Sequence, residues 1–501
     1  MTPAGSLERL AASTILGSFA GADVPDWVLR RIDEGLGGLC LFGSNLAGES
    51  GVEASARVAA DLHNVRPSVL VALDEEGGAV TRLEAATGSS VPGNAALGAV
   101  DNPELTRQVA KALGDVLVDA GIDLNLAPCA DVNVDVANPV IGVRSFGADP
   151  DLVGRHVVAF VQGLQAAGVS ACVKHFPGHG ATSVDSHLDL PEVDAPVELL
   201  QSRELTPFRA AIAAGAATVM TGHLRAPALD TKPATISRRI LTNLLREAMG
   251  FQGAVVTDAL DMRGIGGTEA MPANVVRALA AGADLCCLGS NATDELVCAC
   301  VEAVAGALRS GALEEERLVD AAGRVASIPR LGHLVEADRG ARGPSLGVLG
   351  YEAARRALRI DGPLPPLPGC AHVVQLRRAE MIAAGEVPWG VGDPLAQLDT
   401  ASSSEWLDDP AGVGAALDRA RDCPLVVVIR DPQTNPDTAA MLGALVEARS
   451  DAIVVDMGWP ADDPPVKTRI TTYGPSRASG MAVARLLVGM EPKLEIEERQ
   501  H

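Results

Sequence analysis

The stretch SACVKHFPGHG, residues 170–180, joins a short apolar run to a loop rich in glycine and proline. Its first four residues are small or apolar, which is typical of a buried strand. Lys174 and His175 come directly after this run. The proline and the two glycines that follow do not fit the interior of a helix or a central strand. The pattern therefore predicts a buried strand that delivers a cation and an imidazole to a loop at its carboxyl end.

Similar apolar runs recur along about the first 300 residues, with alanine-rich stretches of helical periodicity between them. Counting the run above, there are eight: 13–17, 38–42, 69–73, 122–126, 170–173, 218–221, 254–257 and 284–288. Alternating strands and helices predict a parallel sheet, and eight such units predict a (β/α)8 TIM barrel. In that fold the functional side chains gather on the loops at the carboxyl ends of the strands.

A second, smaller unit is expected after the barrel. The segment GARGPS, residues 340–345, has the composition of a linker. Beyond it, residues 423–430 and 452–457 are predicted to form buried parallel strands, with a helix over 437–449 between them. We predict a catalytic barrel over 1–335, and a linker with a C-terminal α/β domain over 336–501. The expected fold class is α/β, a TIM barrel followed by a smaller sandwich-like domain.

Composition narrows the classes of partner. A formal net charge of −23 argues against nucleic acid and against an anionic membrane surface. No window reaches the roughly 18 apolar residues that span a bilayer, and the first residues, MTPAGSLERL, lack the pattern of a signal peptide. A cytoplasmic location is the expectation.

The cysteines and histidines do not indicate a metal site. The nine cysteines are odd in number, and Cys40, Cys172, Cys286 and Cys287 lie in apolar runs where reduced thiols pack as small hydrophobic groups. No second ligand pair at zinc spacing accompanies the CxC of residues 298–300, and no third ligand at fixed spacing accompanies the histidines of KHFPGHG. We expect neither a metal nor a cofactor.

Polar residues follow the predicted strands where the barrel rule requires them. They are Asp74 after the third run, Asp131 and Arg144 beyond the fourth, Lys174 and His175 after the fifth, His223 after the sixth and Asp258 after the seventh. Of these, Asp131 is expected only to hold the loop after the fourth strand. Asp258 ends the run AVVTD, so its carboxylate is poised to act as a nucleophile, although a capping role for the next helix is the alternative.

The loop after the fifth run contains Asp185 and His187, two residues apart. A carboxylate beside an imidazole fixes the tautomer of the ring and raises its basicity, which makes a general acid/base near neutral pH. A single histidine is more often structural. His179, in the middle of PGHG, is expected to brace the loop.

The motif KHFPGHG followed by DSH resembles the signature of the β-N-acetylglucosaminidases of glycoside hydrolase family 3. Three further segments are similar to that family: VALDEEGGAVTRL at 71–83, GVRSFGADP at 142–150 and GFQGAVVTDALDM at 250–262. The family more often has glutamine where Glu75 stands. The resemblance extends over nearly the whole chain, and it is thinner in the second domain.

The resemblance implies a retaining exo-β-N-acetylglucosaminidase that releases terminal β-linked N-acetylglucosamine from small-molecule or oligosaccharide substrates, such as cell-wall muropeptides. Asp258 would be the nucleophile, and His187 the acid/base, oriented by Asp185. The substrate-binding residues would be Asp74, Arg82, Arg144, Lys174, His175 and His223.

Several alternatives stay open at this point. An imidazole does not repel an anion, so phosphate could replace water as the acceptor and make the protein a phosphorylase. A β-glucosidase on the same scaffold and a sugar sensor without turnover are the other candidates. A substrate-assisted reaction, in which Glu75 or Glu76 polarises the acetamide of the substrate, is a further hypothesis.

Overall fold

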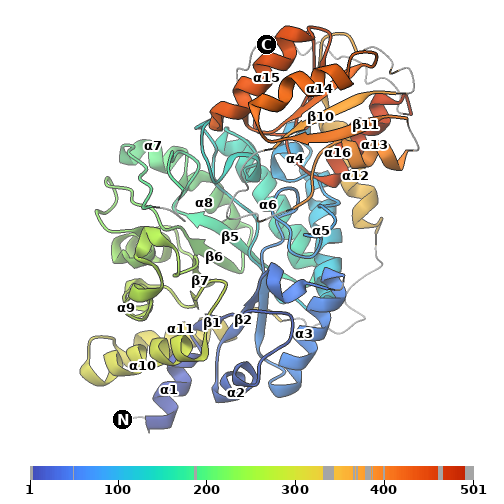
Figure 1. Ribbon diagram of the computed structural model, residues 1–501. Coiled ribbons are helices and arrows are strands. Elements are labelled where there is room, and N and C mark those ends of the chain that lie inside the picture. Colours follow the sequence, from blue (N-terminus) through green and yellow to red (C-terminus); the bar gives the residue numbers. More distant parts are fainter. Residues whose placement is uncertain are drawn as a thin grey trace.

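The computed structural model describes residues 4–48, 50–185, 189–330, 343–364, 367, 370–377, 385, 387–398, 401–460 and 466–490. The chain forms a barrel, coloured blue to yellow in Figure 1, and a second unit, coloured orange to red. The predicted boundary between residues 335 and 336 lies outside the described residues.

The barrel is built from eight strands in the order β7-β6-β5-β4-β3-β2-β1-β8, and neighbouring strands in this order pair in parallel. A bridge between Val256 and Leu285 joins β7 to β8. The strands are β1 (Ile15–Gly17), β2 (Gly38–Leu41), β3 (Leu70–Leu73), β4 (Leu124–Asn125), β5 (Ser170–Phe176), β6 (Thr218–Thr221), β7 (Ala254–Thr257) and β8 (Cys286–Cys287). The eight predicted apolar runs each contain or overlap one of these strands, so the predicted barrel is confirmed.

Helices surround this sheet. They are α1 (Ala4–Ala12), α2 (Asp26–Glu34), α3 (Gly51–Val65), α4 (Asn94–Val100), α5 (Pro103–Asp119), α6 (Pro150–Ala167), α7 (Val197–Ser202), α8 (Leu205–Ala213), α9 (Gly267–Ala281), α10 (Asp294–Ser310) and α11 (Glu315–Ala326). Short 3-10 turns η1 (Gly43–Leu46), η2 (Gly142–Arg144), η3 (Ala234–Ile236) and η5 (Arg263–Ile265) and the π-helix η4 (Arg239–Ala248) complete the barrel.

The helix between β4 and β5 shows how local sequence sets these elements. The side chain of Asp149 accepts hydrogen bonds from the backbone N–H groups of residues 151 and 152, and Pro150 occupies the first turn of α6. Gly168 ends the helix with φ +97°, a left-handed conformation that suits glycine. The chain then enters β5 two residues later, so these caps fix where the strand begins.

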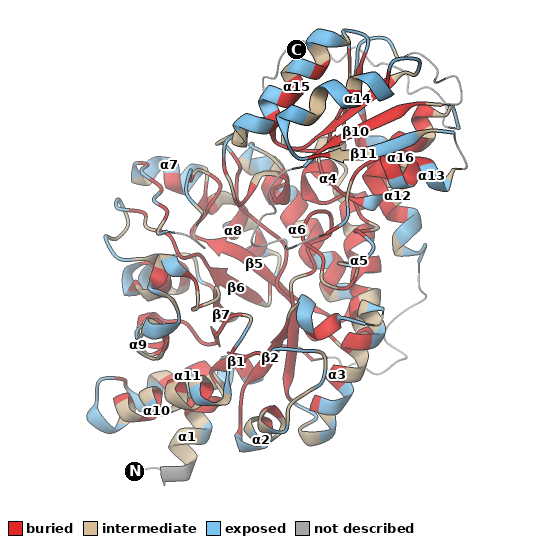
Figure 2. Ribbon diagram, viewed as in Figure 1, coloured by how far each residue is buried: buried red, intermediate tan, exposed pale blue. Residues whose placement is uncertain are grey.

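The barrel has two apolar layers. One fills its interior and includes Leu16, Cys40, Leu70, Cys172 and Cys287. The larger layer lies between strands and helices. Figure 2 shows the strands buried throughout, with exposed residues on the outer helices. The predicted burial of Cys40, Cys172, Cys286 and Cys287 is confirmed.

The second unit is a six-stranded sheet in the order β11-β10-β12-β13-β14-β9, parallel except for the antiparallel pair β14 and β9. The strands are β9 (Arg359–Asp361), β10 (His372–Leu376), β11 (Ser403–Leu407), β12 (Leu425–Ile429), β13 (Ile453–Asp456) and β14 (Thr468–Thr471). The helices are α12 (Leu346–Ala357), α13 (Gly392–Gln397), α14 (Val413–Arg419), α15 (Pro436–Ala448) and α16 (Arg477–Leu487), with turns η8 (Pro410–Gly412) and η9 (Pro432–Thr434). The two predicted strands and the helix between them correspond to β12, β13 and α15.

The second unit touches loops at the carboxyl end of the barrel. Arg477 donates from Nε to the backbone oxygen of Gly88 at 3.2 Å and forms an ion pair with Glu84 at 3.0 Å. Trp459 and Tyr473 pack against a small cluster of barrel residues, Ala79, Ala95 and Val143. These loops follow β3 and β4, so the second unit supports one side of the barrel mouth. Within the part of the chain that the structure describes, no helix has the length and apolar character needed to cross a membrane.

Candidate active site

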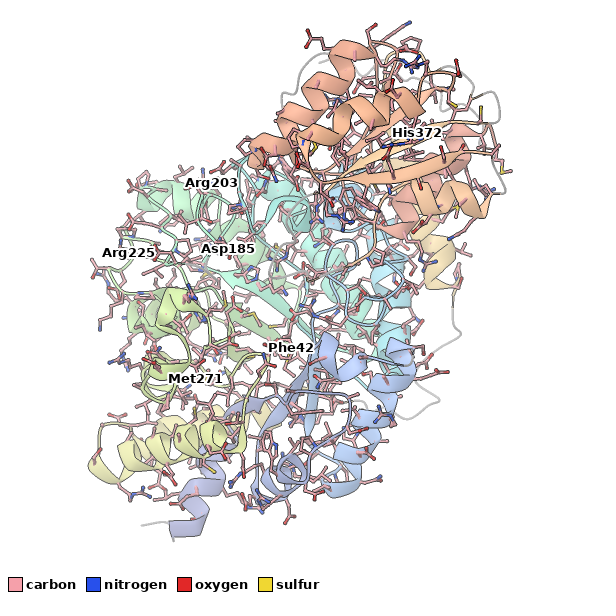
Figure 3. The ribbon with its side chains drawn as sticks, viewed as in Figure 1. Phe42, Asp185, Arg203, Arg225, Met271 and His372 are labelled. Atoms are coloured by element: carbon pink, nitrogen blue, oxygen red, sulfur yellow. The ribbon has the colours of Figure 1, made fainter. Side chains whose placement is uncertain are left out.

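A cavity of about 510 Å³ opens at the carboxyl end of the barrel. Six of the predicted site residues line it: Asp74, Arg82, Arg144, Lys174, His175 and Asp258. They come from the ends of β3, β5 and β7 and from the loop after β4, which are far apart in sequence. Phe42, which follows β2, also lines the cavity and is labelled in Figure 3. The barrel rule therefore brings most of the predicted residues to one place.

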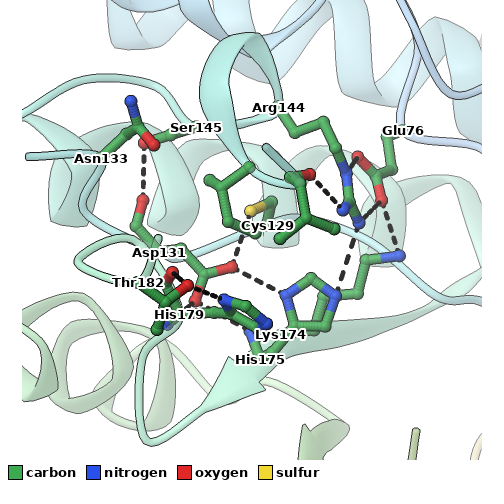
Figure 4. Close-up of polar contacts among 12 residues, drawn as sticks. Glu76, Cys129, Asp131, Asn133, Arg144, Ser145, Lys174, His175, His179 and Thr182 are labelled. Atoms are coloured by element: carbon green, nitrogen blue, oxygen red, sulfur yellow. Dashed lines mark hydrogen bonds and ion pairs between the residues drawn. The ribbon is translucent and has the colours of Figure 1, made fainter. Parts of the chain in front are cut away.

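A network of four charged side chains forms one wall of the cavity. Glu76 accepts hydrogen bonds from Arg144, at 3.0 Å from Nε and 2.8 Å from Nη2. Lys174 Nζ lies 2.7 Å from Glu76 Oε1 and 2.7 Å from Asp74 Oδ1. Figure 4 shows Arg144 and Lys174 converging on Glu76. Because Glu76 and Lys174 are almost fully buried, this network holds both cations in fixed positions.

The shifted pKa values of Glu76, Lys174 and Arg144 keep these three side chains charged. Burial alone would raise the pKa of the Glu76 carboxyl, but Arg144 and Lys174 outweigh that effect and hold the pKa well below its usual range. Burial alone would likewise lower the pKa of Lys174, but Asp74 and Glu76 raise it above the usual value. Two donors with permanent charge thus face the cavity at neutral pH.

Asp131 organises the residues around His175. Its Oδ2 accepts from His175 Nδ1 at 2.7 Å and from the thiol of Cys129 at 3.0 Å, while its Oδ1 accepts from the backbone N–H of His179 at 2.6 Å. Because a carboxylate can only accept, His175 carries its proton on Nδ1 and turns Nε2 toward Arg144, whose Nη2 lies 3.4 Å away. The sequence prediction left Asp131 out of the site.

Cys129, Asp131 and His175 are also the kinds of side chain that bind metal ions. Their potential ligand atoms all lie within 4.8 Å of one another. The short hydrogen bonds from the thiol and the imidazole to Asp131 account for this closeness, and burial keeps the pKa of the Cys129 thiol well above its ordinary value, which opposes the thiolate that a metal needs. We therefore derive no chemical step through a metal.

Asp258 directly follows β7 and is half-buried on the cavity wall. Its Oδ1 accepts a hydrogen bond from the backbone N–H of Ala259 at 2.8 Å. This contact is a local turn, and Asp258 precedes no regular helix directly. The alternative role as a cap of a following helix is therefore not supported by the geometry.

His223 does not line the cavity, which differs from the predicted contact with the sugar. The ring is fully buried, its Nε2 donates to the backbone oxygen of Ala259 at 2.9 Å, and its Nδ1 lies 2.8 Å from Thr235 Oγ1. Both ring nitrogens are thus used within the protein. His223 instead holds the peptide that follows Asp258.

The loop after β5 packs tightly against the loop after β4. A side chain at Gly180 would place its Cβ 2.0 Å from the backbone oxygen of Val132, so this approach requires glycine. Farther along, Asp185 is half-buried and appears in Figure 3. His187 lies outside the described residues, together with its two neighbours.

Glu75 and Glu76 point to different places. Glu75 does not line the cavity; its Oε2 accepts from the backbone N–H groups of Arg82 and Leu83 at 2.8 and 2.9 Å. Both carboxylate oxygens of Glu76 are used by Arg144 and Lys174. Neither acid is therefore placed to polarise a substrate acetamide.

A TIM barrel that gathers a strand-end carboxylate and fixed charged side chains at the carboxyl end of its strands has them where barrel enzymes carry their active sites. The family model described as the glycosyl hydrolase family 3 N-terminal domain matches residues 24–328, so the chain belongs to glycosyl hydrolase family 3. The predicted family is thereby confirmed.

Individual relatives show which members of the family this chain is similar to. A solved structure of a glycoside hydrolase family 3 β-N-acetylglucosaminidase from Paenibacillus sp. str. FPU-7 is 31% identical, with a TM-score of 0.85 and 97% of both chains covered. Beta-hexosaminidase A from Pseudoalteromonas piscicida is 38% identical over 48% of this chain and 43% of its own length. Beta-hexosaminidase from Thiobacillus denitrificans is 35% identical over 53% of this chain and 75% of its own length. The match to the Pseudoalteromonas protein thus spans less than half of that relative.

Proposed function

We propose that the protein is a retaining exo-β-N-acetylglucosaminidase that releases terminal β-linked N-acetylglucosamine. The observation that carries this proposal is the presence of Asp258 on the same cavity wall as Asp74, Arg144, Lys174 and His175. A nucleophile needs its substrate held within reach, and these four side chains offer both donors and acceptors to sugar hydroxyls. The similarity to the Paenibacillus enzyme supports N-acetylglucosamine as the sugar.

In the proposed reaction, the carboxylate of Asp258 attacks the anomeric carbon and the bond to the leaving oxygen breaks. The protonated imidazole of His187 gives its proton to that oxygen, so the sugar is left as an ester of Asp258. Neutral His187 then removes a proton from water, whose oxygen attacks the anomeric carbon and frees Asp258. Two displacements at one carbon retain its configuration. The role of His187, and its orientation by Asp185, rest on the sequence motif.

The charged network suits the binding of the non-reacting part of the sugar. Lys174 and Arg144 are donors that cannot lose their charge near neutral pH, and Asp74 is an acceptor held by Lys174 at 2.7 Å. Arg82 extends this group, since its Nη2 lies 3.8 Å from Asp74 Oδ2. Groups fixed in this way need little rearrangement when the substrate arrives, which favours reaction.

Water is the acceptor that we propose. A β-glucoside phosphorylase structure is only 20% identical to this chain, a likeness that shows the fold alone. We also propose cell-wall muropeptides as the source of the sugar. This part of the proposal rests on the resemblance of the DSH motif to that of the family's β-N-acetylglucosaminidases.

The direct test is turnover of an aryl β-N-acetylglucosaminide, with products identified, in buffers with and without phosphate. We expect free N-acetylglucosamine at the same rate in both buffers. A sugar 1-phosphate formed at a phosphate-dependent rate would show a phosphorylase, and no turnover in either buffer would show a sugar-binding protein without this activity. The matching aryl β-glucoside tests the competing glucosidase.

The acid/base assignment has a test of its own. We expect His187→Ala to lose much less kcat/KM on an aryl substrate with an acidic leaving group, which departs without a proton, than on one with a basic leaving group. Equal losses on both substrates would contradict the assignment of His187 while leaving the glycosidase activity itself intact.

A further inference from the structure

His179 lines the cavity and has one ring nitrogen without a hydrogen-bond partner among the described residues. The side chain is 2% exposed and lines the same cavity as Asp258 and His175. Its Nε2 is buried and makes no hydrogen bond within the part of the chain that the structure describes. Buried polar atoms nearly always have a hydrogen-bond partner, so an unsatisfied one on a cavity wall indicates a ligand group that completes it.

The protonation state of His179 follows from its neighbours. Burial lowers the pKa of the ring to about 4 in spite of the nearby carboxylate of Asp131, so the ring is neutral at physiological pH and carries a single proton. Thr182 Oγ1 lies 2.6 Å from His179 Nδ1, and the same hydroxyl donates to the backbone oxygen of His179 at 3.0 Å. When the hydroxyl gives its only hydrogen to that carbonyl, it accepts from Nδ1–H, and Nε2 is then a bare acceptor.

The position of this acceptor is fixed from three sides. The backbone N–H of His179 donates to Asp131, and its backbone oxygen accepts from Asn138 Nδ2 at 3.0 Å. The ring stands edge-to-face to His175, with 6.0 Å between centroids. The bracing that the sequence predicted for His179 is thus present through Nδ1 and the backbone, and it leaves Nε2 available.

We infer that His179 Nε2 accepts a hydrogen bond from an N–H or O–H group of the bound sugar. The inference rests on the function proposed above and adds a specificity-determining residue to it. In the tautomer that donates from Nδ1–H to Thr182, Nε2 is the acceptor offered to the sugar. A site built around a hydrogen bond rejects analogues that lack the matching group, because its own polar atom is then left unpaired.

The test compares two variants on a series of substrates. His179→Asn keeps a short amide near the Nδ1 position and removes Nε2, while Thr182→Val removes the bracing hydroxyl and leaves the ring. Each is assayed with aryl β-N-acetylglucosaminide, with the corresponding glucoside, which lacks the acetamide N–H, and with the 3-, 4- and 6-deoxy sugars. We expect His179→Asn to lower kcat/KM on the parent substrate by roughly three- to tenfold, mainly through KM.

The pattern across the series decides the outcome. If the inference holds, the loss caused by His179→Asn disappears on one analogue only, and that analogue identifies the donor as the acetamide or a particular hydroxyl. Equal losses on every substrate, or the same profile for Thr182→Val, would show a purely structural role and overturn it. Failure of the wild-type protein to cleave the parent substrate would instead refute the proposed function.

A measurement on the wild-type protein covers the case in which the variants do not fold. With the histidine side chains labelled with ¹⁵N, a bare Nε2 that begins to accept a hydrogen bond shifts upfield. In a neutral Nδ1–H ring the ¹⁵N chemical shifts of the two ring nitrogens are widely separated. We expect the Nε2 signal of one such ring to shift when N-acetylglucosamine is added. The spectrum of Thr182→Val helps to assign this signal among those of the nine histidines. If no neutral Nδ1–H ring responds to the sugar, the inference is wrong.

Discussion

The two ends of the barrel both bury charged side chains, but they use them differently. At the amino end, Asp284 is fully buried; it accepts from the backbone N–H of Val255 at 2.8 Å and pairs with Arg317 at 2.7 Å and with Arg246. All of these partners are groups of the protein itself, and Asp284 does not line the cavity described above.

At the carboxyl end, the network of Glu76, Arg144, Lys174 and Asp74 is just as well paired, yet it forms part of a cavity wall. Burial and ion pairing are therefore common to a structural site and a candidate active site. What distinguishes the candidate active site is that its charged side chains also line an open cavity. The following substitutions test whether this difference separates activity from stability.

The largest effect is expected for Asp258→Ala. Removing the proposed nucleophile should lower kcat by at least about 10⁴-fold, because no covalent intermediate can form. The thermal midpoint should change little, since the Asp258 side chain is only half-buried. Asp261→Asn is the matched control, because Asp261 lines the same cavity. Its loss should be far smaller, and equal losses would contradict the assignment of Asp258.

Glu76→Gln should impair both properties at once. The variant leaves Arg144 and Lys174 without their shared counter-charge, which should destabilise the fold by about 3 kcal/mol or more. It should also lower kcat/KM by roughly 100-fold, because two sugar-binding donors lose their fixed positions. Urea denaturation and steady-state kinetics on the folded fraction measure the two effects. Unchanged kinetics would show that the network has no part in substrate binding.

Asp284→Asn should affect stability alone. It removes the charge that compensates Arg246 and Arg317, at a cost of about 3 kcal/mol in the free energy of unfolding. We expect kcat and KM at temperatures well below the transition to stay at wild-type values. A selective loss of kcat in the folded protein would remove the distinction drawn between the two ends.

The smallest effect is expected for Glu75→Gln, and it depends on pH. Burial raises the pKa of Glu75 to about 7. The folded protein therefore keeps a proton on Glu75 at pH values where the unfolded chain, with the ordinary pKa of glutamate, has already released it. The native state therefore binds more protons between these two values, and the stability of the wild type falls as pH rises through this window. Glutamine cannot ionise, so the variant should gain in thermal midpoint relative to the wild type at pH 8 and lose this advantage at pH 4. A pH-independent difference would contradict the shift.

The sequence predicted the barrel well because most of its strands lie in short, mainly apolar runs that are buried on both faces. Strands β9, β10, β11 and β14 were not predicted. β9 and β11 lie at sheet edges and carry exposed polar residues, β14 has the polar sequence TRIT, and β10, HVVQL, was missed although it is a buried inner strand. Apolar periodicity reports burial, so it is silent where a strand is stabilised mainly by backbone pairing.

The sequence predicted where along the chain the site residues lie, but not what their side chains contact. The rule that strand ends carry function placed His223 at the correct edge of the barrel, but it could not show that Ala259 and Thr235 occupy both of its ring nitrogens. Asp131 carried the same signal, a polar residue after the fourth strand, yet its role depends on a contact with His175, 44 residues away. The sequence likewise could not show that Glu76 lines the cavity while the adjacent Glu75 does not.

The contact between the two units has a thermodynamic consequence. Trp459 and Tyr473 pack on Ala79, Ala95 and Val143, and the same loops carry Glu76 and Arg144 into the cavity wall. A ligand that favours one arrangement of these loops must then change the free energy of docking between the units, and by reciprocity the docking must change the affinity for that ligand by the same factor.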